Sequence, residues 1–234
     1  MNISLKTMSY DMVATSELQP FSSELALVDK FEDFIGDFLC SSIHIEREFE
    51  CGFGIADAVI FKYRQNSYAK DLAKLDANWA YTLKALPYRK NFTIADVSKL
   101  SGSSLQCSKK AVANFLDSGF CIKKDKDIYI KNSQPRKICS SIVGIEAKLK
   151  DWKKALWQAS RYKTFATEAW VMLDRKHATS AIKNIDKFEN FNIGLATFSS
   201  EGHYFEHFSP KKEVPQSEIA SWKANTILAQ KIIT

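Results

Sequence analysis

The chain has 234 residues, of which 45% are hydrophobic and 12% aromatic, and its net charge is +6. This composition excludes a disordered or fibrous chain, because it supplies enough apolar surface for one large or two small globular domains. No apolar run approaches the roughly 18 residues of a membrane span, and the first residues do not resemble a signal peptide. We therefore expect a cytoplasmic protein rather than a membrane or secreted one.

The first predicted element is an amphipathic helix over residues 22–39, with Ser22 or Ser23 as its N-cap. Its apolar positions repeat at helical spacing and are Leu27, Val28, Phe31, Phe34, Ile35, Phe38 and Leu39. Glu24 interrupts this apolar stripe, whereas Glu32 lies on its flank. Because a carboxylate directed at a core is costly unless it has a partner, Glu24 is a candidate functional residue.

Residues 43–63 are predicted to form two strands joined by a glycine-containing turn at 51–54. In the second strand, "GIADAVIF", side chains alternate between two faces, and Asp57 lies on the same face as Ile55 and Val59. An acid here replaces an apolar residue inside a strand that looks buried. Asp57 is therefore the second candidate functional residue.

The middle of the chain has a helical pattern followed by short strands. The apolar spacing predicts one helix from about residue 69 to Pro87, and a short helix between Thr93 as N-cap and Gly102. A third helix within 103–120 precedes two short strands around a polar turn. Three helices followed by a small hairpin is the order of a winged-helix domain.

A polar linker at 134–137 leads to the apolar strand "ICSSIVGIEAKL". Glu146 and Lys148 lie two positions apart in this strand, so both side chains lie on one face and that of Ala147 on the other. The remaining predicted elements are a helix over 152–162, a strand at 167–173, a helix over 176–188, a hairpin within 191–209 that turns near Glu201 and Gly202, and a helix over 216–232.

Without residues 66–136 the predicted order is helix, strand, strand, strand, helix, strand, which is typical of a mixed α/β layer. The expected fold class is α/β, with a three-layer core in which helices flank a central mixed sheet. We expect this core to comprise residues 1–65 and 138–234, and an inserted winged-helix domain to comprise residues 66–137.

Glu24, Asp57, Glu146 and Lys148 each interrupt an apolar face of the predicted core. Converging carboxylates cannot all stay ionised unless a cation joins them, and hard oxygen ligands suit Mg²⁺ or Mn²⁺. Such an ion can activate water, while a neighbouring ammonium group can stabilise the charge that develops on a phosphate. The pattern therefore favours phosphodiester hydrolysis.

These residues resemble the signature of the PD-(D/E)xK nuclease superfamily, which has the restriction-endonuclease-like fold. The family's acid at the second core strand is matched by Asp57, and its glutamate on the first helix by Glu24. Its (D/E)xK triplet on the third strand is matched by Glu146-Ala147-Lys148. The resemblance implies metal binding by Asp57, Glu146 and the Ala147 carbonyl, with Lys148 as the catalytic cation and Glu24 as a supporting group.

Many members of the family carry a Q-x-x-x-Y-like element on the helix after the third core strand. Here "QASRY" is similar to it, and the resemblance implies Gln158 as a supporting catalytic group; simple helix packing is the alternative. The resemblance covers about residues 22–65 and 138–208.

Two departures from the family pattern and two further triplets need an explanation. The proline of the family name is Ala56 here, and 89 positions separate Asp57 from Glu146, where a hairpin needs roughly a dozen or two. An inserted domain accounts for this spacing, because the cost of loop closure grows slowly with length. Further [DE]xK triplets begin at Asp151 and Asp174, but only the triplet at Glu146 follows an apolar strand and precedes the expected helix.

Positive charge is concentrated in the middle of the chain. Residues 62–163 hold 22 Lys and Arg against 8 Asp and Glu, a net charge of +14, and the remainder has a net charge of −8. Such asymmetry is typical of a phosphate-binding surface, so the expected partner is nucleic acid, with DNA favoured. The residues expected to contact it are Ser104, Gln106, Ser108, Lys109 and Lys110 on the third helix of the insertion, Lys123, Lys124 and Lys126 on its wing, and Arg161 in the core.

The cysteines and histidines do not predict a metal or disulfide framework. The five cysteines lack the close pairs of zinc sites and small disulfide scaffolds, so reduced thiols are expected. They are Cys40, Cys51, Cys107, Cys121 and Cys139. The four histidines are scattered, and no histidine-based metal site is expected.

Three functions are compatible with the sequence. The first is a Mg²⁺-dependent endonuclease or exonuclease, which would need two chains for double-strand cleavage because each chain has one site. The second is a catalytically silent nucleic-acid-binding or regulatory protein of the same fold. The third is a partner protein in a larger defence or mobile-element complex, in which the winged helix binds protein. Taken alone, Glu146 and Lys148 could also be a surface ion pair, and Asp57 a turn residue.

Overall fold

The computed structural model describes residues 18–36, 42–52, 54–64 and 67–233. Its contacts divide the chain into two compact units. The first unit contains the described residues up to 62 together with 141–216, and the second contains residues 63–140 and 217–234 as far as they are described.

A six-stranded mixed sheet organises the first unit, with the strand order β1-β2-β6-β7-β8-β9. The strands are β1 (Ile43–Glu50), β2 (Ile55–Tyr63), β6 (Cys139–Lys148), β7 (Glu168–Asp174), β8 (Gly194–Phe198) and β9 (Tyr204–Phe208). β6, β7 and β8 run parallel, whereas β1–β2 and β8–β9 are antiparallel pairs. The predicted α/β class with a mixed central sheet is confirmed.

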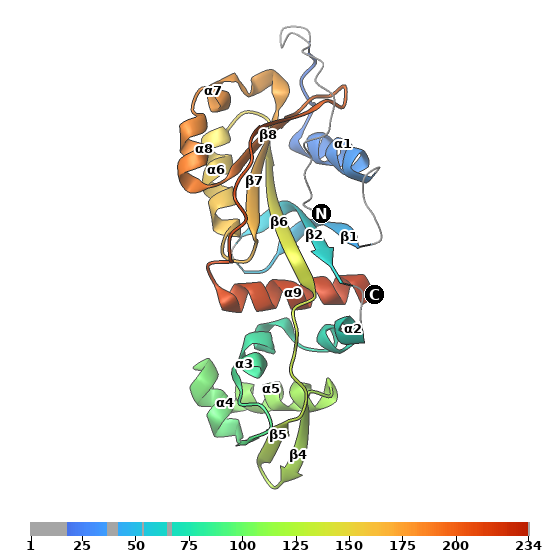
Figure 1. The fold of residues 1–234 in the computed structure, drawn as a ribbon, viewed down its shortest axis with the longest axis vertical. Helices are drawn as coiled ribbons and strands as arrows, with labels where there is room; N and C mark the ends of the chain where they lie inside the picture. Colours follow the sequence, from blue (N-terminus) through green and yellow to red (C-terminus); the bar gives the residue numbers. More distant parts are fainter. Residues whose placement is uncertain (1–17, 37–41, 53, 65–66, 234) are drawn as a thin grey trace. The chain divides into compact units, whose positions relative to one another are not determined.

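Helices lie on both faces of this sheet (Figure 1). Helix α1 (Glu24–Gly36) covers one face, and α6 (Trp152–Tyr162), α7 (Thr179–Ile182) and α8 (Ile185–Phe191) cover the other. The helix predicted over 176–188 is instead three short segments, η2 (Arg175–His177), α7 and α8. The prediction of one continuous helix was wrong. The backbone of Asn184 leaves the helical conformation, with φ −116° and ψ 33°, and separates α7 from α8.

The core beneath α1 fixes which strand residues face the site. Val143, Ile145 and Ala147 of β6 pack in one apolar cluster with the buried side of α1. Because side chains alternate along a strand, Glu146 and Lys148 point to the opposite face, where α6 lies. The α1 cluster also contains Phe21, Leu27, Val28, Phe31, Ile35, Ala58, Ile60, Met172, Ala196, Phe198 and Tyr204.

The first predicted helix is present, but Glu24 does not occupy the place assigned to it. Glu24 is the first residue of α1, and its side chain is 49% exposed. Its carboxylate lies 3.1 Å from Lys148 Nζ at the end of β6 and is not part of the apolar core beneath α1. The predicted apolar positions Phe38 and Leu39, and also Cys40, lie outside the described residues.

The second unit consists of helices and a small antiparallel sheet with the order β3-β5-β4. Its elements are α2 (Ser67–Ala73), η1 (Ala77–Trp79), α3 (Ala80–Ala85), β3 (Asn91–Phe92), α4 (Ile94–Ser101), α5 (Leu105–Asp117), β4 (Cys121–Asp125), β5 (Ile128–Lys131) and α9 (Glu218–Ile233). Thr93 caps α4 in a capping box, as its sequence position predicts.

Two features of the second unit differ from the sequence-based expectation. The single helix predicted from residue 69 to Pro87 is divided into α2, η1 and α3, because the Asp76 side chain accepts a hydrogen bond from the Asn78 backbone and starts a new helical segment. In addition, α9 packs against α2, η1 and α3, so residues 217–234 group with the second unit and not with the core to which 138–234 was assigned.

Two expectations about the whole chain can be compared with the described residues. Cys107, Cys121 and Cys139 are free thiols, as predicted. Within the described part of the chain, none of the helices is both long enough and apolar enough to span a membrane.

A stability prediction follows from the close approach of β7 and β8 at Gly194. Gly194 is paired with Trp170, and a methyl group on it would lie 2.2 Å from two ring atoms of that indole. We expect Gly194→Ala to lower the free energy of unfolding by about 1–3 kcal/mol, because the ring or the strand must shift. Urea unfolding followed by circular dichroism measures the effect.

Gly36→Ala is the matched control, since Gly36 ends α1 and a methyl group there meets no other atom of the described residues within 4 Å. This variant should be neutral or more stable by up to about 1 kcal/mol. Equal stability of the two variants would contradict the packing of Trp170 on Gly194.

Candidate active site

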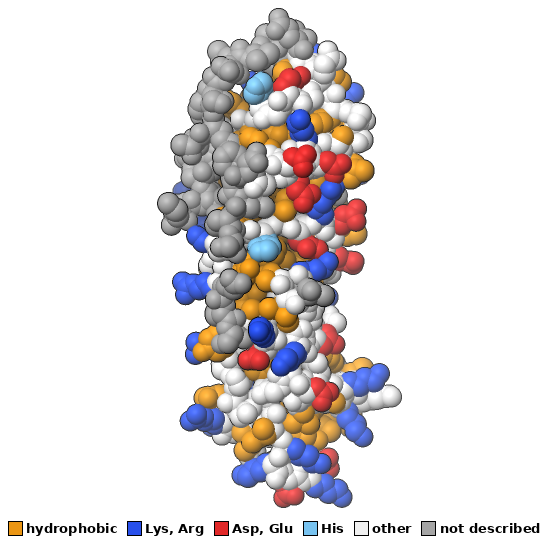
Figure 2. Space-filling model, turned by 90° about the vertical axis from the view of Figure 1, so that its right-hand side faces the viewer, with side chains coloured by type: hydrophobic (Ala, Val, Ile, Leu, Met, Phe, Trp, Pro, Cys, Tyr) orange, Lys and Arg blue, Asp and Glu red, His pale blue; other side chains and the backbone are white. Residues whose placement is uncertain are grey.

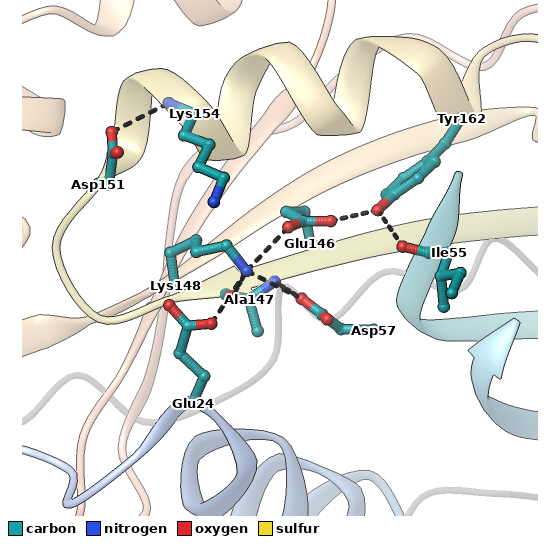
Figure 3. Close-up of polar contacts among 9 residues, drawn as sticks. All are labelled: Glu24, Ile55, Asp57, Glu146, Ala147, Lys148, Asp151, Lys154 and Tyr162. Atoms are coloured by element: carbon teal, nitrogen blue, oxygen red, sulfur yellow. Dashed lines mark hydrogen bonds and ion pairs between the residues drawn. The ribbon is translucent and has the colours of Figure 1, made fainter. Parts of the chain in front are cut away.

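Four charged side chains from three elements of the first unit meet at the end of β6. Glu24 comes from the first turn of α1, Asp57 from β2, and Glu146 and Lys148 from β6 (Figure 3). The structure therefore brings together the four residues that the sequence singled out, although 124 positions separate Glu24 from Lys148.

The ammonium group of Lys148 is the centre of this cluster. Its Nζ lies 2.9 Å from Glu146 Oε1, 3.1 Å from Glu24 Oε2 and 3.7 Å from Asp57 Oδ2. It also donates a hydrogen bond of 2.9 Å to the carbonyl oxygen of Ala147. The side chain of Lys148 is 11% exposed and that of Glu146 1%, so this pair is shielded from water, unlike Glu24.

Asp57 is held by the strand next to it. Its Oδ2 accepts a hydrogen bond of 2.7 Å from the backbone N–H of Ala147. The same oxygen faces Lys148, so one carboxylate oxygen ties β2 to the (D/E)xK segment of β6. The side chain remains 33% exposed, which leaves Asp57 accessible from solvent.

Tyr162, the last residue of α6, is a member of the site that sequence reasoning did not select. Its hydroxyl group contacts Glu146 Oε2 and donates a hydrogen bond of 2.8 Å to the carbonyl oxygen of Ile55. Tyr162 is buried, and Gly144 makes room for it, because a methyl group on Gly144 would lie 3.0 Å from Tyr162 Cβ. The tyrosine of "QASRY" was the available signal.

The Tyr162 hydroxyl group lies between two acceptor oxygens, one of which belongs to Glu146. A phenol has one proton to donate, yet the Tyr162 hydroxyl faces two acceptors, Ile55 and Glu146. The hydroxyl group can therefore donate its proton to only one of these two oxygens at a time. Burial raises the pKa of Glu146, although the Tyr162 hydroxyl group and the charge of Lys148 oppose this shift.

The other ionisable groups of the cluster are shifted for related reasons. Burial raises the pKa of Asp57, although the bond from Ala147 N–H and the charge of Lys148 oppose this. Burial acts to lower the pKa of Lys148, but the neighbouring carboxylates of Glu146, Asp57 and Glu24 outweigh it and raise that pKa. Lys148 is therefore a permanent ammonium ion at neutral pH.

The donor atoms around Lys148 suit a hard divalent cation. Asp57 Oδ2, Glu146 Oε1 and the Ala147 carbonyl oxygen all lie within 3.7 Å of Lys148 Nζ, and Mg²⁺ and Mn²⁺ prefer oxygen ligands of this kind. Glu146 Oε1 is buried and, within the described ranges, accepts no hydrogen bond, meeting Lys148 as an ion pair. Among the described residues, no group of three or more His, Cys, Asp and Glu side chains is arranged to hold a metal ion.

Gln158 lies one turn before Tyr162 on α6 but is not joined to the cluster. Its Oε1 is buried and has no hydrogen-bond partner in the part of the chain that the structure describes. The role of Gln158 as a supporting catalytic group therefore stays a prediction.

The residues expected to bind nucleic acid in the second unit differ in accessibility. Gln106, Lys109 and Lys110 are exposed on α5, and so are Lys123, Lys124 and Lys126 of the β4–β5 hairpin. The prediction for Ser108 was wrong, because this residue is fully buried on the inner face of α5. Ser104 is exposed, and its side chain caps α5 by accepting a hydrogen bond from the Cys107 backbone.

Comparison with protein-family models, with curated proteins and with solved structures finds no match for this chain.

A pH-dependent stability change follows from the position of Lys148. Lys148→Met leaves the Glu146 and Asp57 carboxyl groups without their cation and should lower the free energy of unfolding by about 3 kcal/mol at pH 7.5. Carboxyl groups with a raised pKa in the folded chain bind more protons folded than unfolded. Their contribution to stability therefore grows as pH falls toward the unfolded pKa of about 4, and the variant should recover at least about 1 kcal/mol relative to the wild type by pH 5.

Urea unfolding at pH 7.5 and pH 5 measures this recovery. Lys150→Met is the control, because Lys150 is exposed on the loop that follows β6. A deficit of Lys148→Met that is the same at both pH values would mean that the carboxyl groups do not depend on this ammonium group.

Proposed function

We propose that the chain is a metal-dependent nuclease that hydrolyses phosphodiester bonds, with DNA as its substrate. The observation that carries this proposal is the meeting of Glu24, Asp57, Glu146 and Lys148 at the end of β6. A buried carboxylate and a buried ammonium group are costly to maintain in a core, and perturbed groups of this kind cluster at functional sites.

Each residue of the cluster has a chemical role in this proposal. Asp57, Glu146 and the Ala147 carbonyl would hold Mg²⁺ or Mn²⁺, which supplies Lewis-acid activation of water and neutralises charge on the phosphate. Lys148 has three N–H donors and can stabilise negative charge that develops on the phosphate oxygens. Glu24 orients Lys148, with its Oε2 3.1 Å from Nζ, and Tyr162 fixes the rotamer of Glu146.

The proposed family assignment is the PD-(D/E)xK superfamily with its restriction-endonuclease-like fold. Support comes from the element order α1, β1, β2, β6, α6, β7 and from the mixed sheet with helices on both faces (Figure 1). The acid of β2 and the triplet of β6 also lie on neighbouring strands, as the family signature requires.

We further propose that α3 to β5 form a winged-helix domain that binds DNA. The order helix, strand, helix, helix, strand, strand and the small sheet β3-β5-β4 support this assignment. Lys and Arg side chains are spread over the surface of the second unit in the view of Figure 2. In this proposal Gln106, Lys109 and Lys110 of α5 contact the DNA, since they are exposed on one helix.

Cleavage assays with active-site variants test the nuclease proposal. Purified protein is incubated with linear, circular, single-stranded and branched DNA in the presence of Mg²⁺, Mn²⁺ or EDTA. We expect cleavage with the metals and none with EDTA. Asp57→Asn should reduce the rate by at least about 100-fold while leaving the fold intact, because asparagine can still accept the Ala147 N–H bond.

Glu24→Gln should reduce the rate by roughly tenfold, because the amide no longer balances the charge of Lys148. Glu32→Gln is the control on the same helix, since Glu32 pairs with Arg47 at 3.5 Å. Full activity of Asp57→Asn, or a larger loss in Glu32→Gln than in Glu24→Gln, would contradict the site. Metal binding without cleavage of any substrate would favour a silent or complex-dependent protein.

The DNA-binding role of α5 is tested by the salt dependence of affinity. The double variant Lys109→Ala/Lys110→Ala should bind DNA more weakly, and the magnitude of the slope of log K against log salt concentration should fall by about one or two. The slope falls because fewer counterions are released on binding when a phosphate contact is lost. Fluorescence anisotropy in EDTA measures this slope. An unchanged slope would assign α5 to protein docking instead.

A further inference from the structure

An exposed tryptophan lies on α6, the helix that also carries Tyr162. Trp157 is 60% exposed, whereas Trp152 on the same helix is 7% exposed and Trp222 is 5% exposed. Burying an indole ring is strongly favourable, so a ring left in water within a well-packed unit requires an explanation. Packing of α6 on the sheet does not explain the position of Trp157, because this residue is not among the buried residues of the helix. Those residues are Trp152, Ala155, Leu156, Ala159 and Tyr162.

Arg161 holds this ring from one side. Its guanidinium carbon lies 5.1 Å from the centre of the Trp157 ring, within the range of a cation–π contact. The same group lies flat against Gly54, since a methyl group on Gly54 would be 3.5 Å from Cζ and 3.7 Å from both terminal nitrogens. The turn between β1 and β2 therefore supports Arg161, and Arg161 supports Trp157.

The Trp157–Arg161 pair is connected to the candidate active site through Tyr162 and the start of β2. Tyr162 directly follows Arg161, and its hydroxyl group contacts Glu146. The carbonyl of Ile55, the residue after Gly54, accepts the other bond of the Tyr162 hydroxyl. The two segments that hold the pair, α6 and the start of β2, therefore also position the Tyr162 hydroxyl group that contacts Glu146.

The charge of α6 indicates what this surface binds. Lys153, Lys154 and Arg161 are exposed on it, Lys150 precedes it, and after the N-cap Asp151 the helix has no acidic residue. Figure 3 shows the Lys154 side chain extending from α6 toward Glu146 and Lys148. An aromatic ring among cationic side chains is the arrangement of surfaces that bind single-stranded nucleic acid.

We propose that Trp157 and Arg161 form a stacking platform for an unpaired nucleotide, and that the preferred substrate is nucleic acid with a single-stranded segment at the site. The position of the nucleotide relative to the scissile bond rests on the proposed nuclease function. In a duplex each base is already stacked between its neighbours, so a surface indole gains contact area only from a base that is unpaired. Lys154 is suited to the adjoining phosphate.

Exposed Trp and Arg are also common at protein interfaces, so a protein partner is the competing occupant. Lysine is depleted at protein interfaces relative to the rest of the surface. Because Lys150, Lys153 and Lys154 are exposed on α6 or directly before it, a polyanion is favoured over a protein partner. Direct binding measurements separate the two.

The test uses the full chain in EDTA, so that binding is measured without cleavage. Affinities for a labelled oligothymidylate, an oligouridylate and a DNA duplex of the same length are determined by anisotropy. Trp157→Leu should weaken binding of the single strand by roughly tenfold or more and change duplex binding by no more than about twofold, whereas Trp157→Tyr should retain most of the affinity. The oligouridylate shows whether the platform discriminates DNA from RNA.

Phe191→Leu is the matched control, because Phe191 is 56% exposed on α8 of the same unit. Quenching of the intrinsic fluorescence by oligothymidylate should persist in this control and be largely lost in Trp157→Leu. Unchanged single-strand affinity of Trp157→Leu, an equal loss on the duplex, or no oligonucleotide binding by the wild type would overturn the platform. If single-strand binding depends on Trp157 but no metal supports cleavage, the nuclease proposal fails and the platform stands.

Discussion

The contact of one ammonium group with three carboxylates is the interaction on which the candidate site depends. Lys148 faces Glu24 of α1, Asp57 of β2 and Glu146 of β6. Three carboxylates within a few ångströms of one another would repel strongly, and the buried one would have no water to screen it. The ammonium group therefore allows α1, β2 and β6 to bring acids to a single point.

The strand residues of the site could be predicted from the sequence because a strand has a strict period of two. Asp57 and Glu146 were recognisable as acids within apolar strands, and the structure confirms that β2 and β6 are neighbours in the sheet. Glu24 was selected for a reason that proved wrong. It is half-exposed at the helix N-terminus and reaches Lys148 from there, a geometry that the helical stripe does not encode.

Other features could not be predicted because they depend on contacts between distant segments. Tyr162 looks like a packing residue until its hydroxyl meets Ile55 and Glu146. Ser108 looks accessible on a polar helix until its face is covered. The break before η1 arises from one side-chain hydrogen bond of Asp76, and the break after α7 arises from the backbone conformation of Asn184. Helix α9 belongs to the second unit because it packs with α2, η1 and α3. A local sequence pattern specifies none of these features.

The discontinuous course of the chain has a consequence for the order of folding. Helix α9, residues 218–233, packs with helices of the second unit that are synthesised well over a hundred residues earlier. The site itself joins segments 90, 107 and 124 positions apart. Contacts of such high sequence separation form late, because much loop-closure entropy is lost before they are gained. During synthesis the site therefore cannot assemble before β6, which carries Glu146 and Lys148, has emerged.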